Sequence, residues 1–144
     1  MAKHKRLKSL GDAIIKRADR LQANVFEGVR EAAIVTNQVA VLSTPVDTGY
    51  ARSRWTTTIG FPIGSESGPT ERVELGEEIA TSIALSQGVA EIKKWKGIGS
   101  IFISNPLEYA FYLDEGSSTQ APNGMTEEAI HAGQAVLREL KLLD

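Results

Sequence analysis

The side chains of this chain that could do chemistry are few and far apart in the sequence. The two histidines are His4, inside a basic N-terminal stretch, and His131, in a segment with no recognisable active-site motif around it. A nucleophilic site needs a nucleophile, a base and a group that orients the base. The chain has no cysteine and no Gly-x-Ser-x-Gly turn, so it offers no nucleophile of these kinds. His131 is expected to be an ordinary helix residue.

The acidic residues do not form a catalytic or metal-binding pattern. Three pairs of acids are adjacent in segments expected to be helical: Glu77–Glu78, Asp114–Glu115 and Glu127–Glu128. General acid–base catalysis by two acids requires both side chains to face one cleft. Adjacent residues on a helix point about 100° apart, so the members of these pairs do not. With no cysteine, distant histidines and no Asp-rich calcium loop, we predict no metal and no cofactor. In the stretch 96–100 the glycines are in the wrong order for a phosphate-binding loop, and no lysine follows them.

One triplet, Asp47-Thr48-Gly49, matches the catalytic triplet of aspartic proteases in letters. The apolar run that precedes that triplet in proteases is missing here. A turn is the simpler interpretation, because Asp47 can accept backbone hydrogen bonds and Gly49 can adopt a positive φ angle. A small hydrolase using Asp47 remains the enzyme alternative, and the main prediction is that the chain is not an enzyme.

Composition and charge indicate a globular protein with an uneven charge distribution. The 144 residues are 42% apolar and 24% charged, and no apolar run approaches the roughly 18 residues that span a bilayer. We therefore expect one domain over residues 1–144, made in the cytoplasm, with no membrane contact. Residues 1–20 carry seven basic and two acidic groups, a net +5; since the whole chain carries −2, the remainder carries −7.

The basic terminus has two interpretations. Residues 1–8 are expected to be flexible, and a solvated, frayed terminus is the simpler account. Alternatively, the terminus contacts DNA or an acidic partner such as a portal protein. The candidate contact residues are Lys3, Lys5, Arg6 and Lys8.

Hydrophobic periodicity and the positions of glycine, proline and capping residues predict an α+β fold. It has a long N-terminal helix, a small β-sheet with an extended loop, and two to three further helices. The predicted elements are a helix at 9–43, a strand at 55–61, a loop at 62–70, a helix at 75–95, a strand at 98–104, a short helix at 105–116 and a helix at 126–142. The first helix would be roughly 50 Å long. A helix that extends beyond its own core usually finds a neighbour.

Several residues are assigned to helix faces or caps. Ser9 is expected to cap the long helix, on which Leu7, Leu10 and Ile14 begin an apolar face. In the second helix, the small residues Ala80, Ala84 and Gly88 would let another backbone approach closely, while Ile79 and Ile83 lie one turn apart. The last helix is expected to place four residues on one face: Ile130, Gly133, Leu137 and Leu140.

The short helix at 105–116 has signals at both ends. Asn105 is the expected N-cap, with Pro106 at the first helical position and Glu108 where a capping box places its acid. Gly116 stands where a C-terminal cap favours a left-handed residue. The residues expected to face the core are Tyr109, Tyr112 and Leu113.

Two segments, taken in order, resemble the neck and tail-completion (minor tail component) proteins of tailed bacteriophages. The first is Thr44–Trp55, with the turn Pro45, Val46, Asp47, Thr48 and Gly49 followed by Ala51 and Arg52. The second is Ile101–Met125. Its matching positions are Asn105, Tyr109, Ala110, Glu115, Gly116, Ser117, Gln120, Ala121, Pro122, Gly124 and Met125. The two segments cover about a quarter of the chain. Many relatives carry a bulky residue where this chain has Ser117.

The resemblance implies a structural virion protein with no catalytic residues. Its expected role is a neck or tail-completion subunit that forms a ring of six or twelve copies between the portal and the tail, with DNA passing through the lumen. The alternatives within the same class are a tail terminator and a head-completion (connector) protein. The expected partners are further copies of the chain, adjacent portal and tail proteins, and non-specifically the genomic DNA. We expect ring neighbours to bind through the long helix and through residues 59–72.

Overall fold

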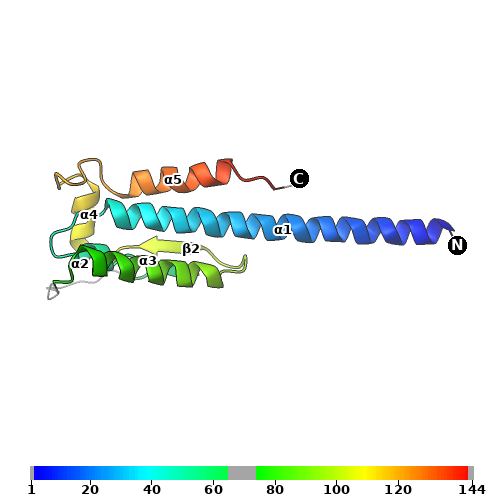
Figure 1. The fold of residues 1–144 in the computed structure, drawn as a ribbon, viewed down its shortest axis with the longest axis horizontal. Coiled ribbons are helices and arrows are strands. Elements are labelled where there is room, and N and C mark those ends of the chain that lie inside the picture. The colour runs from blue at the N-terminus through cyan, green and yellow to red at the C-terminus, as the bar shows by residue number, and fades with distance from the viewer. Residues whose placement is uncertain (1, 65–73, 143–144) are drawn as a thin grey trace.

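The segments of the sequence assemble around one long helix, as a computed structural model shows (Figure 1). The structure describes residues 2–64 and 74–142, so most of the 62–70 loop, and of the 59–72 segment expected to bind ring neighbours, lies outside the described residues. The elements are α1 (Ala2–Ser43), α2 (Tyr50–Ser53), β1 (Thr56–Ile59), α3 (Glu77–Lys94), β2 (Ile101–Ser104), α4 (Glu108–Asp114) and α5 (Thr126–Arg138). The predicted α+β class with a long first helix is confirmed.

The first helix begins earlier than predicted. It starts at Ala2, so Ser9 does not cap it, and the terminus predicted to be flexible is helical from residue 2. Residues 2–8 contain alanine, lysine, arginine and leucine, which are strong helix formers, and no glycine or proline. The N-terminal half of α1 extends well past the other elements (Figure 1). No helix of the described chain is long and apolar enough to cross a membrane.

The other helices pack on the C-terminal half of α1, with α5 along one side and α3 along another (Figure 1). Glycines make the approach close: a β-carbon at Gly133 would collide with Thr36, and one at Gly88 with the Asn37 side chain. The small-residue face predicted for the second helix is confirmed, since Ala80 and Ala84 are fully buried. The backbones can therefore pack closely only because these positions carry little or no side chain.

Ile92 of α3 is fully buried, but several other large residues of these helices lie at the flanks of the contacts. Ile79 and Ile83 of α3 are 57% and 45% exposed, and Ile130 and Leu137 of α5 are 52% and 45% exposed. The single apolar face predicted for the last helix is therefore only partly right. Gly133 is buried against α1, whereas the two large residues beside it remain open to solvent.

The two strands pair antiparallel, with Thr56 opposite Ser104 and Ile59 opposite Ile101. Both predicted strands are confirmed: the first is shortened at both ends, and the second begins three residues later than predicted but ends at Ser104 as predicted. The side chain of Gln87 on α3 completes the free edge of β1: its Oε1 accepts from the Thr57 amide at 2.9 Å, and its Nε2 donates to the Thr57 carbonyl at 2.8 Å. This glutamine provides the hydrogen bonds that a third strand would otherwise make.

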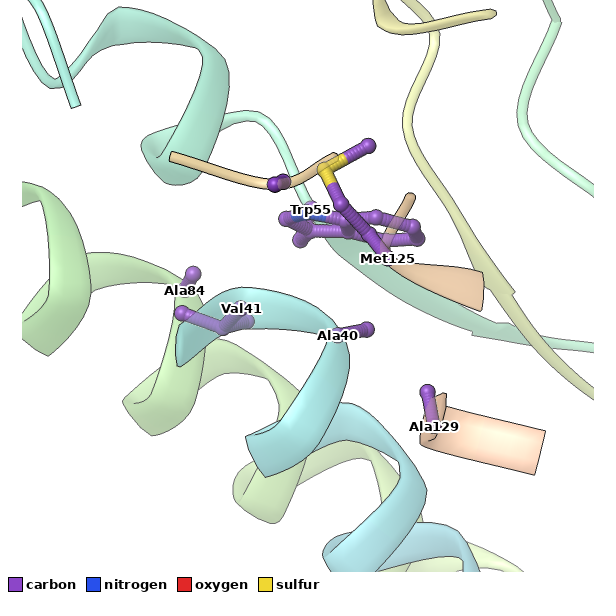
Figure 2. Packing of buried hydrophobic residues seen from close by; sticks show 7 residues of the cluster. Ala40, Val41, Trp55, Ala84, Met125 and Ala129 are labelled. Carbon is purple, nitrogen blue, oxygen red and sulfur yellow. The ribbon is translucent and has the colours of Figure 1, made fainter. Parts of the chain in front are cut away.

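The core lies where α1, β1, α3 and the start of α5 meet. Figure 2 shows the Trp55 indole beside the Met125 side chain, with Val41 and Ala84 on the facing helices. Val41 and Met125 are at most 1% exposed, and Trp55 is 5% exposed. This cluster joins the end of the long helix to both segments of the resemblance.

The short helix differs from its prediction at one end. It begins at Glu108 with Leu107 as its N-cap, and no side chain caps it. Asn105 instead forms a turn, in which its Oδ1 accepts from the Leu107 amide at 3.3 Å. Tyr112, predicted to face the core, is 58% exposed.

The C-terminal end of the short helix is confirmed. Gly116 has φ = 84°, and the amides of Gly116 and Ser117 donate to the carbonyls of Leu113 and Tyr112. These two bonds are those of a Schellman motif, in which the left-handed residue favours glycine.

Candidate functional site

The turn after α1 fixes the path of the chain into the body. The Thr48 carbonyl accepts from the amides of Leu75 and Gly76 at 2.9 and 3.1 Å, which ties the turn to the start of α3. Gly49 has φ = 83°, and a β-carbon there would lie 2.6 Å from the Gly76 carbonyl oxygen. Glycine is therefore required at this position both for its backbone angle and for space. The positive φ angle predicted for Gly49 is confirmed.

Arg52 closes the C-terminal end of α1. Its side chain is 7% exposed, and its guanidinium donates to the carbonyls of Leu42 and Thr44. These carbonyls lie at the helix end, where no further turn supplies amides to them. Arg52 also contacts Glu77 at 3.0 Å and the Thr81 hydroxyl at 3.1 Å. One buried cation thus joins α1 to α3.

Thr44 links the same helix end to the first strand. Its hydroxyl donates to the Ala40 carbonyl at 2.7 Å and accepts from the indole N–H of Trp55, also at 2.7 Å. Thr44 is 1% exposed, so both partners are needed to satisfy its hydroxyl away from water. Sequence analysis placed Thr44 at the border of the motif without assigning it this role.

The second segment of the resemblance binds directly to the first. Gln120 pairs with both backbone groups of Val46, accepting from its amide at 3.0 Å and donating to its carbonyl at 3.2 Å. Asn105 Nδ2 donates to the Ala51 carbonyl at 2.8 Å. The two segments are 74 and 54 residues apart at these pairs, so the motif residues form one unit rather than two.

Apolar contacts support these hydrogen bonds. Tyr50 and Ala51 of α2 form a buried cluster with Leu107 and Ala110, and Tyr109 packs against it. Ala121 joins the main core at 6% exposed. The motif alanines are therefore positions where two backbones lie close together.

A hollow of about 210 Å³ lies between the two segments. The residues that line it are Pro45, Val46, Asp47, Thr48, Gly49, Tyr50, Ala51, Tyr109, Leu113, Ser118 and Gln120. Asp47 is exposed at this hollow and is the one carboxylate among these described lining residues. Because aspartic protease chemistry uses two carboxylates that share a proton, the described hollow holds half of such a pair. Its remaining groups are amide, hydroxyl and apolar groups, which suit the recognition of a protein surface.

Asp114 has a structural role that the sequence did not reveal. Its Oδ1 accepts from the amides of Met125 and Thr126 at 2.8 Å, and its Oδ2 accepts from the Thr126 hydroxyl at 2.5 Å. The carboxylate thereby caps the N-terminus of α5 from the end of the preceding helix, α4. Burial raises its pKa, but the hydrogen bonds from Thr126 and Met125 outweigh burial, and the pKa lies below its ordinary value. An acid in the last turn of a helix is unfavourable for the helix dipole, and that was the signal available in the sequence.

Glycines hold the loop between α4 and α5 in one shape. A β-carbon at Gly116 would collide with the Pro122 carbonyl, and one at Gly124 with the Asp114 carbonyl. Both glycines have positive φ angles. Pro122 itself is exposed, as is Glu115, so these two motif residues are presented on the surface rather than packed inside.

The basic candidates lie far from the hollow. Lys3, Lys5, Arg6 and Lys8 are exposed on the first turns of α1, at the opposite end of that helix (Figure 1). The described residues contain no group of three or more histidine, aspartate or glutamate side chains placed to hold a metal ion. Searches against protein-family models, curated proteins and solved structures find no match to this chain.

Proposed function

We propose that the chain is a structural virion protein of a tailed bacteriophage, a neck or tail-completion subunit that forms a ring at the head-to-tail junction. The observation that carries the proposal is the union of the two resembling segments. Gln120 binds the backbone of Val46, and Asn105 binds that of Ala51. The two segments are 74 and 54 positions apart at these pairs and form one structural unit, which supports treating them as a single motif.

The contacts made by the charged residues of this unit favour a structural role over a catalytic one. Arg52 binds carbonyls that the end of α1 leaves unsatisfied, and Asp114 binds amides at the start of α5. Groups held in this way stabilise a surface rather than carry a reaction. The chain therefore acts by presenting a fixed set of loops to its neighbours, which are other copies and adjacent portal and tail proteins.

The protruding half of α1 supports assembly. Leu7, Leu10 and Ile14 are 66%, 58% and 61% exposed, and they lie on one face of the helix. A solvated apolar face of this length is typical of an interaction surface. We propose that it contributes to a ring of six or twelve copies, and that the neighbouring basic residues contact the DNA in the lumen or an acidic portal surface.

The test of this function is deletion of the gene from its phage, followed by negative-stain electron microscopy of the lysate. We expect DNA-filled heads beside finished but unattached tails. Abnormally long tails would favour the tail terminator role instead, and heads that lose their DNA would favour head completion. Complete infectious particles would contradict all three virion roles.

One substitution distinguishes a hydrolase from the structural role. A hydrolase would lose turnover in Asp47→Asn while keeping its fold, because the acid is exposed at the hollow. The structural role predicts instead that the purified chain hydrolyses no peptide substrate, with or without the substitution. Turnover that disappears in Asp47→Asn would contradict the structural proposal.

A further inference from the structure

The apolar face of the α1 overhang, residues 2–20, continues an interface that the chain already uses. Further along the same helix, Gly28 lies against Leu140, and Thr36 lies against Gly133 of α5. The C-terminal tail covers α1 as far as Asn24, whose Nδ2 donates to the Leu142 carbonyl at 3.0 Å. Beyond that point Leu7, Leu10 and Ile14 remain exposed. Leu7, Ile14 and Gly28 are spaced by multiples of seven, so the uncovered face extends the covered one.

The body carries an apolar groove of about 470 Å³ beside the same helix. Its floor includes Val29 and Ala33 of α1, and one wall is formed by Ile101 and Ile103 of β2. The other wall is formed by Ile130 and Leu137 of α5, which are about half exposed. The groove therefore explains why the two large residues of α5 are not packed within the described chain.

The overhang of a molecule cannot enter its own groove. Both lie on α1, which is one continuous helix from Ala2 to Ser43 (Figure 1). Only another molecule can bring an apolar helix face to the groove. The overhang has the anchors that helix-in-groove recognition uses, since Leu7, Leu10 and Ile14 are at positions i, i+3 and i+7.

We propose that the α1 overhang of one copy lies in the groove between α1, β2 and α5 of the next copy. This inference rests on the proposed ring and names the two surfaces that join its subunits. The contact is heterologous, because it pairs two different surfaces, and such contacts repeat head to tail until they close. A helix of about 20 residues is roughly 30 Å long, enough to follow the groove along α1.

Charge favours the same partner. Residues 1–20 carry a net +5, and the remaining residues carry −7. The overhang of one copy is therefore attracted to the body of the next, and the attraction weakens as salt is added. An association made only through apolar contacts would lack this salt dependence.

The test is site-directed cross-linking in the full chain, which contains no native cysteine. One set of copies carries Leu7→Cys, Leu10→Cys or Ile14→Cys, and a differently tagged set carries Ile130→Cys or Leu137→Cys. With a short bismaleimide, we expect a mixed cross-link between at least one overhang position and one groove position. Lys16→Cys is the matched control, because it lies on the opposite face of the overhang and should give little mixed product.

Two results would overturn the proposal. The first is efficient cross-linking of the overhang variants to themselves, which would show that overhangs pair with overhangs. The second is the absence of mixed cross-links from every pair, whether the chain is monomeric or associated. As a second measurement, Leu10→Glu should weaken association by at least about tenfold in sedimentation velocity, while its thermal unfolding stays that of the parent.

The docking of the overhang and the neck role in the virion can be contradicted independently. Mixed cross-links together with complete particles from the gene deletion would keep the docking and remove the neck assignment. A neck defect without mixed cross-links would keep the neck assignment and remove the docking.

Discussion

At its C-terminal end α1 is enclosed, with Ala40 and Val41 at most 2% exposed and its last carbonyls bound by Arg52. At its N-terminal end Leu7, Leu10 and Ile14 are each more than half exposed. Both ends follow the same helical periodicity in sequence. The difference is that glycines and alanines at the C-terminal end admit neighbouring helices, whereas the large residues at the N-terminal end contact no other element of the described chain.

This comparison assigns different roles to the two ends. The enclosed end contributes strongly to the stability of the fold, because removing one of its buried side chains leaves a cavity or an unsatisfied polar group. We propose that the open end contributes to association, and we expect it to contribute little to the stability of a single molecule. Substitutions at the enclosed end should therefore change the free energy of unfolding far more than substitutions at the open end.

Replacing the core tryptophan should have the largest effect. Trp55→Ala removes a side chain that is 5% exposed and leaves the Thr44 hydroxyl without its indole donor. We expect a loss of about 3–5 kcal/mol in the free energy of unfolding, measured by urea denaturation. Leu10→Ala on the open end is the matched control, with a change within about 0.5 kcal/mol at concentrations where the chain is monomeric. Equal losses in the two variants would contradict the separation.

Replacing Arg52 should cause the second-largest loss in the free energy of unfolding. Arg52→Met keeps most of the side-chain volume but leaves the buried Thr44 carbonyl without its charged donor. We expect a loss of about 2–3 kcal/mol in the free energy of unfolding. Glu77→Gln tests whether the ion pair matters instead; since the Glu77 side chain is 71% exposed, its replacement should cost less than about 1 kcal/mol. A larger loss for Glu77→Gln than for Arg52→Met would show that the ion pair, and not the helix end, is the important contact.

The pair between Gln120 and Val46 joins the two motif segments at the surface. Gln120→Ala removes both hydrogen bonds, and we expect a loss of about 1 kcal/mol. Amide hydrogen exchange should also become faster at residues 46–49. The neighbouring exposed residue provides the control, since Thr119→Ala should leave both quantities unchanged. Unchanged exchange in Gln120→Ala would mean that the segments stay together without this pair.

Asp114 makes the stability depend on pH. Its pKa is lower in the folded chain than in the unfolded chain, so its contribution is present above the unfolded pKa and is lost as pH falls through the folded pKa. Asp114→Asn should cost about 1 kcal/mol at pH 7, and the difference from the parent should shrink below about pH 4. Urea denaturation of both proteins at pH 7 and pH 3 measures this difference in the free energy of unfolding. A difference that stays constant between the two pH values would contradict the role of the carboxylate as the cap of α5.

Much of the fold was predictable from local signals. The left-handed Gly116, the strand residues around Thr57 and the small-residue face at Ala80 and Ala84 each have a local cause that a sequence displays. Asn105 shows the limit of this approach. It has the right type and position for an N-cap, but its amide is engaged with Ala51, so a tertiary contact determines where the helix begins.

The candidate site was predictable as a set of residues but not as a geometry. Several of the motif positions line one hollow, although nothing in the periodicity indicates that Gln120 pairs with Val46. Asp114 and Thr44 were not assigned because their partners lie on other elements. The exposure of Ile130 and Leu137 was also unpredictable, since it depends on how closely Gly133 lets α5 approach α1.

Hydrogen exchange measured below and above the concentration of self-association tests the central claim most directly. In the dilute chain, amides of residues 2–20 should exchange quickly and those of residues 28–43 slowly. On association, we expect new protection in residues 2–20 together with the groove segments 101–103 and 130–137, and none at the hollow. Association that leaves residues 2–20 in fast exchange would show that the open end of α1 does not join copies of the chain.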